Sequence, residues 1–248
     1  MNILDIAGLR VRVGSFNLGP IDLGIHRGDF VSLIGPNGSG KSTLITALLG
    51  LNRHVVSGTV RLFGESALSR PRAPFSRVAY VTDSPRDVLG EFTAEEYWDY
   101  CRLAFESARG TSIDGWDERA DTYAQMLDFP LGTRRPLSAL SLGTARKAQI
   151  IAALLPAPEF VVLDEPFIGL DFLASRSFEA LLLGLRERRV TVLASSHDLD
   201  LATRVASRVM VLRSGRMVLD ASMPSLRGGV EAAVTSALSG ARTRRSER

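Results

Sequence analysis

Gly35-Pro36-Asn37-Gly38-Ser39-Gly40-Lys41-Ser42-Thr43 is the stretch that decides the fold of this chain. It fits the pattern G-x-x-x-x-G-K-[ST] of a phosphate-binding loop. The apolar residues 30–34 before it predict a buried strand, and residues 44–49 after it predict a helix that stops at Gly50. Glycines let such a loop turn its N–H groups inward, toward an anion at the helix N-terminus. The context therefore predicts an α/β fold built around a phosphate site.

The last residues of the loop carry its chemistry. Lys41 can reach the β- and γ-phosphates, and the Ser42 hydroxyl is placed to ligate Mg²⁺. The plain alternative is a glycine-rich turn before an ordinary helix, and the flanking strand and helix argue against it.

The composition is that of a soluble globular protein. The 248 residues are 45% hydrophobic and 23% charged, with a net charge of +3, which allows one large α/β domain or a domain with an inserted subdomain. A single cysteine excludes an internal disulfide and suits a reducing compartment. We expect no secretory signal at residues 1–5 and no membrane span, because the longest apolar segment is residues 150–155.

The first part of the chain predicts strands. Residues 1–27 alternate apolar and polar side chains, with a turn expected at residues 17–20, and residues 60–63 resemble a further strand. This predicts an N-terminal antiparallel β layer around the strand that feeds the phosphate loop.

The middle of the chain predicts an inserted helical subdomain over about residues 85–140. Thr93 and Glu96 form a capping box that starts a helix running to Gly110, and a second helix is expected over residues 117–127.

The last part returns to α/β character. Apolar runs at 160–163 and 190–194 predict strands of a parallel sheet, and 208–212 with 216–219 predict a hairpin. Residues 228–248 are expected to form a short helix and a basic tail, either solvated or in contact with anionic lipid or a partner.

Two adjacent carboxylates end the apolar strand at 160–163. Asp164 is suited to hold Mg²⁺ through water, as the partner of Ser42. Glu165 faces another direction and can polarise an attacking water. We expect both to be functional, because ligand sites of α/β proteins form at the carboxyl ends of strands.

Two further loops carry polar groups. His197, after the strand at 190–194, either caps the following helix or contacts a γ-phosphate. Ser141 and the Gly143 N–H group, at the start of a predicted helix, form a second anion-binding device. Because the chain has one phosphate loop, this second device suggests a ligand shared between two chains.

Five motifs in order resemble an ATP-binding-cassette ATPase over nearly the whole chain; they are residues 35–43, 140–144, 163–166, 169–171 and 196–198. The resemblance implies ATP and Mg²⁺ as cofactors and a head-to-tail dimer of two such subunits, identical or different. It further implies that Lys41 and Ser42 bind phosphate and Mg²⁺, and that Ser141 and Gly143 clamp the partner's ATP. Glu165 becomes the catalytic base and His197 the γ-phosphate switch, with Asp171 at the dimer seam.

The chain departs from the family pattern at three places. Asp83 stands where the family has a glutamine or glutamate that contacts Mg²⁺ and the membrane partner. The aromatic that stacks on adenine is absent at residues 12–13, where Phe16 or an arginine guanidinium is the substitute. Leu142 replaces a common glycine. We expect slower or partner-dependent hydrolysis.

The function expected from the resemblance is that of a cytoplasmic transporter subunit. It would bind and hydrolyse ATP on the inner face of the cell membrane and drive export through a separate transmembrane subunit. The alternative is a soluble cassette ATPase acting on nucleic acid or ribosomes. The small net charge and the lack of a second cassette argue against a nucleic-acid partner.

Overall fold

The structure is a computed structural model of the chain, and it describes residues 2–68, 75–84, 90–197, 199–226 and 229–240. Of residues 200–202 it describes the backbone alone. The expected basic tail, the start of the helical insert at 85–89 and Asp198 lie outside the described residues.

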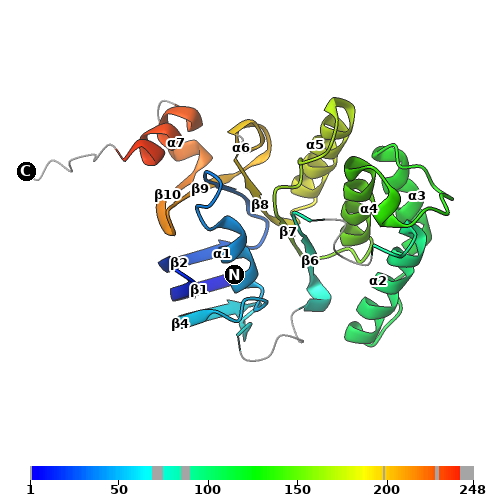
Figure 1. Cartoon of the computed structure of the whole chain (residues 1–248), viewed down its shortest axis with the longest axis horizontal. Coiled ribbons are helices and arrows are strands. Elements are labelled where there is room, and N and C mark those ends of the chain that lie inside the picture. The colour runs from blue at the N-terminus through cyan, green and yellow to red at the C-terminus, as the bar shows by residue number, and fades with distance from the viewer. Residues whose placement is uncertain (1, 69–74, 85–89, 198, 227–228, 241–248) are drawn as a thin grey trace, which may run out of the picture.

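A small antiparallel sheet opens the chain, as predicted (Figure 1). Its strand order is β2-β1-β4-β5. The strands are β1 (Asn2–Val13), β2 (Phe16–His26), β4 (Val55–Leu62) and β5 (Glu65–Ser66).

The turn predicted at residues 17–20 is wrong, because these residues lie inside β2 and the chain turns at residues 14–15 instead. β2 is the edge strand of its sheet, where a proline such as Pro20 is tolerated. Gly19 is needed for close packing, since a Cβ there would lie 2.1 Å from the Leu9 carbonyl oxygen. The signal that resembled a turn therefore marks a close contact between β1 and β2.

The second sheet has the order β10-β9-β3-β8-β7-β6. Its strands from β9 to β6 are parallel, and only β10 is antiparallel to its neighbour. They are β3 (Phe30–Ile34), β6 (Val78–Val81), β7 (Phe160–Leu163), β8 (Thr191–Ser196), β9 (Arg208–Arg213) and β10 (Arg216–Ser222). All residues of β3, β7 and β8 are buried, as expected for a sheet covered on both faces.

Seven α-helices lie in the described residues (Figure 1). They are α1 (Lys41–Leu48), α2 (Ala94–Arg109), α3 (Trp116–Met126), α4 (Leu142–Leu154), α5 (Phe172–Glu187), α6 (Leu199–Val205) and α7 (Val230–Ser239). Short 3-10 turns occupy Phe75–Arg77, Leu137–Ala139 and Met223–Ser225. Within the described ranges, no helix has the length and apolar character of a membrane span.

The capping box that begins α2 is confirmed. The Thr93 N–H group donates to Glu96 Oε2 at 2.8 Å, and the Glu96 N–H group donates to Thr93 Oγ1 at 3.3 Å. The helix ends at Gly110, whose φ of 73° is left-handed. Trp98 of α2 donates its indole N–H to the Ala148 carbonyl of α4 at 3.0 Å. The first helix of the helical insert therefore packs on α4.

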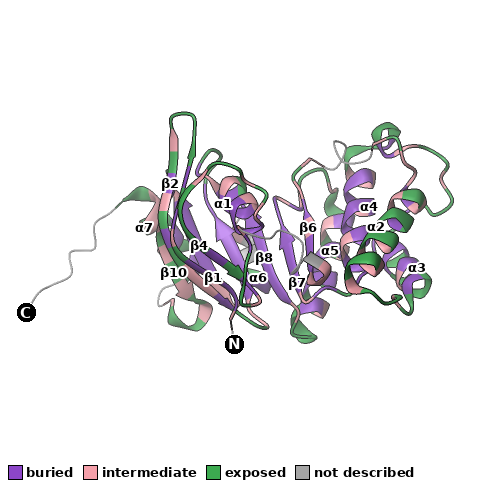
Figure 2. Cartoon of the chain, turned by 90° about the horizontal axis from the view of Figure 1, so that it is seen from below, coloured by how far each residue is buried: buried purple, intermediate pink, exposed green. Residues whose placement is uncertain are grey.

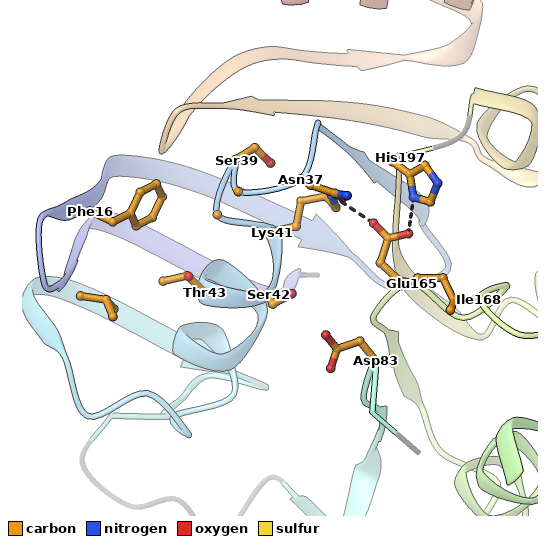
Figure 3. A pocket seen from close by; sticks show the side chains of 13 residues that line it. Phe16, Asn37, Ser39, Lys41, Ser42, Thr43, Asp83, Glu165, Ile168 and His197 are labelled. Carbon is orange, nitrogen blue, oxygen red and sulfur yellow. Dashed lines mark hydrogen bonds and ion pairs between the residues drawn. The ribbon is translucent and has the colours of Figure 1, made fainter. Parts of the chain in front are cut away.

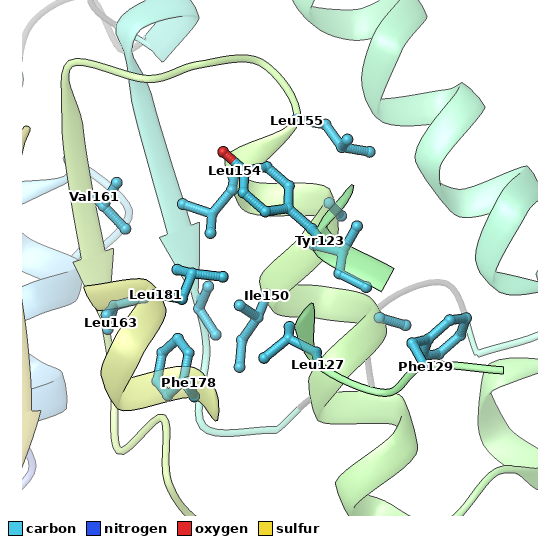
Figure 4. Close-up of a cluster of buried hydrophobic side chains, with 14 of the residues drawn as sticks. Tyr123, Leu127, Phe129, Ile150, Leu154, Leu155, Val161, Leu163, Phe178 and Leu181 are labelled. Carbon is cyan, nitrogen blue, oxygen red and sulfur yellow. The ribbon is translucent and has the colours of Figure 1, made fainter. Parts of the chain in front are cut away.

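The buried residues, whose positions are purple in Figure 2, form two large hydrophobic clusters. One lies between the antiparallel layer, α1 and the parallel sheet. The other joins the parallel sheet to the helices α2 to α5, with Ile150, Leu154 and Phe178 among its members (Figure 4). The α/β fold with a parallel sheet, an antiparallel β layer and a helical region is therefore confirmed.

Candidate functional site

Four parallel strands end at one edge of the large sheet. β3 leads into the phosphate loop, β6 into Asp83, β7 into Asp164 and β8 into His197. Since the carboxyl ends of neighbouring parallel strands meet at one edge, residues far apart in sequence come together here.

A cavity of about 650 Å³ opens at this edge (Figure 3). Residues 37–43 of the predicted phosphate loop, together with Glu165, His197 and Asp83, make up most of its lining, whereas Gly35 and Pro36 are not among the lining residues. The described lining residues are Val13, Phe16, Asn37, Gly38, Ser39, Gly40, Lys41, Ser42, Thr43, Asp83, Glu165, Ile168 and His197.

The glycines of the phosphate loop are required by its shape. Gly38 and Gly40 have φ angles of 76° and 105°, which favour glycine. A Cβ at Gly35 would lie 2.4 Å from the Leu212 carbonyl oxygen, and one at Gly40 would lie 2.7 Å from the Phe16 ring. Phe16, one of the two expected substitutes for the missing adenine-stacking aromatic, therefore lies against the loop and lines the cavity.

Lys41 and His197 converge on Glu165 (Figure 3). The buried Lys41 ammonium lies 3.0 Å from Glu165 Oε1 and donates to the Gly35 carbonyl at 2.7 Å. His197 Nδ1 lies 2.9 Å from Glu165 Oε2. The His197 side chain thus faces the cavity, the position predicted for a contact with the γ-phosphate.

Asp164 is fully buried beneath this group. Burial raises the pKa of its carboxyl group above the ordinary value, and the carboxylates of Asp83 and Glu165 raise it further. The hydrogen bond from the Ser195 hydroxyl opposes this shift in pKa, and so does the nearby hydroxyl of Ser42. Its second oxygen, Oδ2, is buried and has no hydrogen-bond partner in the protein.

Asp164 lies near the Ser42 hydroxyl and has one carboxylate oxygen without a partner. This pair of groups fits Mg²⁺, because proteins bind Mg²⁺ through a few side chains while phosphate and water supply the other ligands. Asp83 lines the same cavity, so the three residues predicted for the metal lie near one another. Among the described residues, no group of three or more His, Cys, Asp and Glu side chains could hold a metal by itself.

Ser141 and Gly143 do not line this cavity. Ser141 caps α4, with its Oγ accepting from the Thr144 N–H group at 3.0 Å. A Cβ at Gly143 would lie 2.4 Å from the Gly169 carbonyl oxygen, and one at Gly169 would lie 2.6 Å from the Leu142 side chain. The loop at Ser141 and Gly143 therefore packs on residue 169 and lies outside the cavity formed by this chain's own phosphate loop.

Sequence reasoning missed two residues of the site. Ile168 lines the cavity, and Ser195 bonds to Asp164 from β8. Neither residue type carries a local signal, since both depend on which strands are neighbours in the sheet.

The arrangement can bind a triphosphate and assist its hydrolysis. The loop N–H groups and Lys41 suit the phosphates, and Glu165 is a carboxylate placed to accept a proton from water.

Comparison with known proteins agrees with this chemistry. The model of the ABC transporter family matches residues 18–168. The chain is 33% identical over 204 residues to a putative ABC transporter ATP-binding protein of Methanopyrus kandleri, covering 82% of this chain and 74% of the relative. It is 34% identical over 222 residues to the phosphonates import ATP-binding protein PhnC of Trichormus variabilis, covering 86% and 90%.

A solved structure of the ATP-binding subunit of an ABC transporter superposes with a TM-score of 0.84 at 25% identity, covering 96% of this chain and 99% of the other. The residues matched by the family model include the phosphate loop, Asp164 and Glu165. The chain therefore belongs to the ABC transporter family, and it is an ATP-binding-cassette ATPase.

Proposed function

We propose that the chain is one single-domain cassette subunit, with its helical insert at about 85–140, that hydrolyses ATP to drive a separate transmembrane subunit. The observation that carries the proposal is the convergence of Lys41, Glu165 and His197 on one cavity beside the phosphate loop. In this role the subunit works in the cytoplasm, on the inner face of the membrane.

The proposed reaction uses the chain's own groups as follows. The phosphate loop and Lys41 bind the triphosphate, Glu165 accepts a proton from the attacking water, and His197 donates to the γ-phosphate. Ser42, Asp164 and Asp83 would hold Mg²⁺, which would supply positive charge to the phosphate oxygens.

The proposed active unit is a dimer. Ser141 and Gly143 lie outside the cavity of their own chain, so the ATP they clamp belongs to a second cassette subunit. The start of α5 supports this arrangement, because Phe172 and Leu173 are 73% and 75% exposed next to Asp171.

Export is the proposed direction, from the resemblance of residues 92–97 and 140–144 to exporter cassettes. The relative named as a phosphonates import protein shows that likeness of this degree occurs with importers too. Asp83, between the cavity and the helical region, is the proposed contact that passes nucleotide state to the membrane subunit.

The test is Glu165→Gln in the full chain with Mg-ATP, with and without the membrane subunit. We expect ATP binding to persist, turnover to fall at least about a hundredfold, and a dimer to accumulate in size-exclusion chromatography with light scattering. Unchanged hydrolysis would remove Glu165 as the base. A protein that stays monomeric with bound ATP under all conditions contradicts the dimer.

The remaining alternative is a soluble cassette ATPase that acts on nucleic acid or ribosomes. Purification of the protein from membranes distinguishes this alternative from the transporter subunit. We expect the subunit to copurify with a protein of several membrane spans. Recovery with ribosomes, and not with such a protein, would favour the alternative.

A further inference from the structure

The hydroxyl of Ser195 links the two carboxyl residues at the end of β7. Ser195 is fully buried. Its Oγ donates to Asp164 Oδ1 at 2.6 Å and accepts from the backbone N–H of Glu165 at 2.9 Å. A hydroxyl has one proton to donate, so the bond to Asp164 uses it and fixes the orientation of the group.

The register of the sheet produces this contact. β7 and β8 are parallel neighbours, and Leu163 lies opposite Ala194. Asp164 follows Leu163 and Ser195 follows Ala194, so Ser195 and Asp164 lie side by side. The other neighbour of β8 is β3, which carries Ser32. The Ser32 hydroxyl is also buried but has no hydrogen-bond partner among the described residues, so it makes no such link.

The backbone at Glu165 needs support. Its φ is 47°, a left-handed conformation that residues other than glycine rarely adopt. The hydrogen bond from its N–H to Ser195 fixes the peptide at that point. This conformation aims the Glu165 side chain between Lys41 and His197, at 3.0 and 2.9 Å.

We propose that Ser195 is a positioning residue for ATP hydrolysis. Its single hydroxyl turns Asp164 so that the second carboxylate oxygen is free to act on Mg²⁺, and it holds the backbone that aims the Glu165 carboxylate at the attacking water. The inference rests on the proposed roles of Asp164 and Glu165.

The proposal predicts which property of the enzyme depends on Ser195. Removing the hydroxyl leaves Asp164 Oδ1 and the Glu165 N–H without their shared partner, whereas the phosphate loop is not touched, because Ser195 does not line the cavity. The loss therefore appears in turnover and in dependence on Mg²⁺, and not in nucleotide binding measured without the metal.

The test compares Ser195→Ala, Ser195→Thr and the control Ser32→Ala in the full chain. Three quantities are measured: kcat and KM for ATP, the Mg²⁺ concentration at half-maximal effect, and binding of a fluorescent ATP analogue with Mg²⁺ or with EDTA. For Ser195→Ala we expect a fall in kcat and a rise in the Mg²⁺ requirement of about 10- to 100-fold. Binding in EDTA stays within about twofold of wild type, and Ser195→Thr restores most of both losses.

Equal behaviour of Ser195→Ala and Ser32→Ala overturns the proposal. The proposal is also overturned if Ser195→Ala weakens nucleotide binding in EDTA by the same factor as it lowers kcat, because that result indicates general damage to the fold. If the wild type itself shows no Mg²⁺-dependent binding, the proposed metal site fails first, and that result is visible without the variants.

Discussion

The guanidinium of Arg146 in α4 donates to the backbone carbonyl of Asp83 at 2.6 Å. It also donates to the Thr82 carbonyl and to Gln149 Oε1, and Arg146 is fully buried. The helix that Ser141 caps is therefore held, through the Arg146 side chain, to the loop that carries Asp83 into the nucleotide cavity.

Replacing Arg146 tests how much this contact contributes. Burial lowers the pKa of the guanidinium, and the nearby carboxylates of Asp83 and Asp164 oppose this shift. Hydrogen bonds from a charged group contribute about 1.5–3 kcal/mol each. We expect Arg146→Gln to lower the free energy of unfolding by about 2–4 kcal/mol and to reduce ATPase activity, as measured by urea unfolding and phosphate release.

The matched control is Lys147→Gln, the next residue of α4, which makes one exposed hydrogen bond to the Asp128 carbonyl at 3.1 Å. Its effect on unfolding should stay below about 0.5 kcal/mol. Similar effects of the two variants would show that the buried hydrogen bonds of the Arg146 guanidinium do not stabilise the folded protein.

Much of the fold could be predicted because its signals are local. The glycine spacing at residues 35–43, the capping box at Thr93 and the uniformly apolar strand at 160–163 each specify their own element. The bonds from Arg146 to the Thr82 and Asp83 carbonyls and from Ser195 to Asp164 could not be predicted, since each joins residues more than 30 positions apart. Such contacts depend on the order of strands in the sheet, which no short pattern encodes.

Asp164 provides a prediction about pH. Because burial raises its pKa in the folded protein, the ionised carboxylate is less favourable in the folded than in the unfolded chain. The folded protein therefore loses stability as the pH rises from about 4, the value for an unfolded aspartate, through the raised pKa. At neutral pH Asp164 therefore makes the nucleotide-free protein less stable than it is near pH 4.

We expect Asp164→Asn to raise the free energy of unfolding at pH 7–8 without Mg²⁺, and to abolish hydrolysis. The gain in stability should shrink as the pH is lowered toward about 4, as followed by urea unfolding at several pH values. Asp171→Asn is the control. Asp171 caps α5, its Oδ1 accepting from the Ala174 N–H group at 2.8 Å, and Asn replaces Asp at a helix cap with little cost. A less stable Asp164→Asn protein at pH 8 would contradict a raised pKa.

Phe16 provides a prediction about the nucleobase. Its ring lines the cavity and lies against Gly40, so it is placed to stack on adenine. Base–aromatic stacking contributes about 1–3 kcal/mol, hence Phe16→Ala should weaken ATP binding by roughly 5- to 150-fold, whereas Phe16→Tyr should keep it.

The decisive comparison is between ATP and inorganic tripolyphosphate, measured by isothermal titration calorimetry. Tripolyphosphate uses the phosphate loop and Lys41 but has no base, so its affinity should not change in Phe16→Ala. An equal loss for both ligands would mean that Phe16 supports the loop through Gly40 and leaves adenine to another group, such as the guanidinium of Arg12.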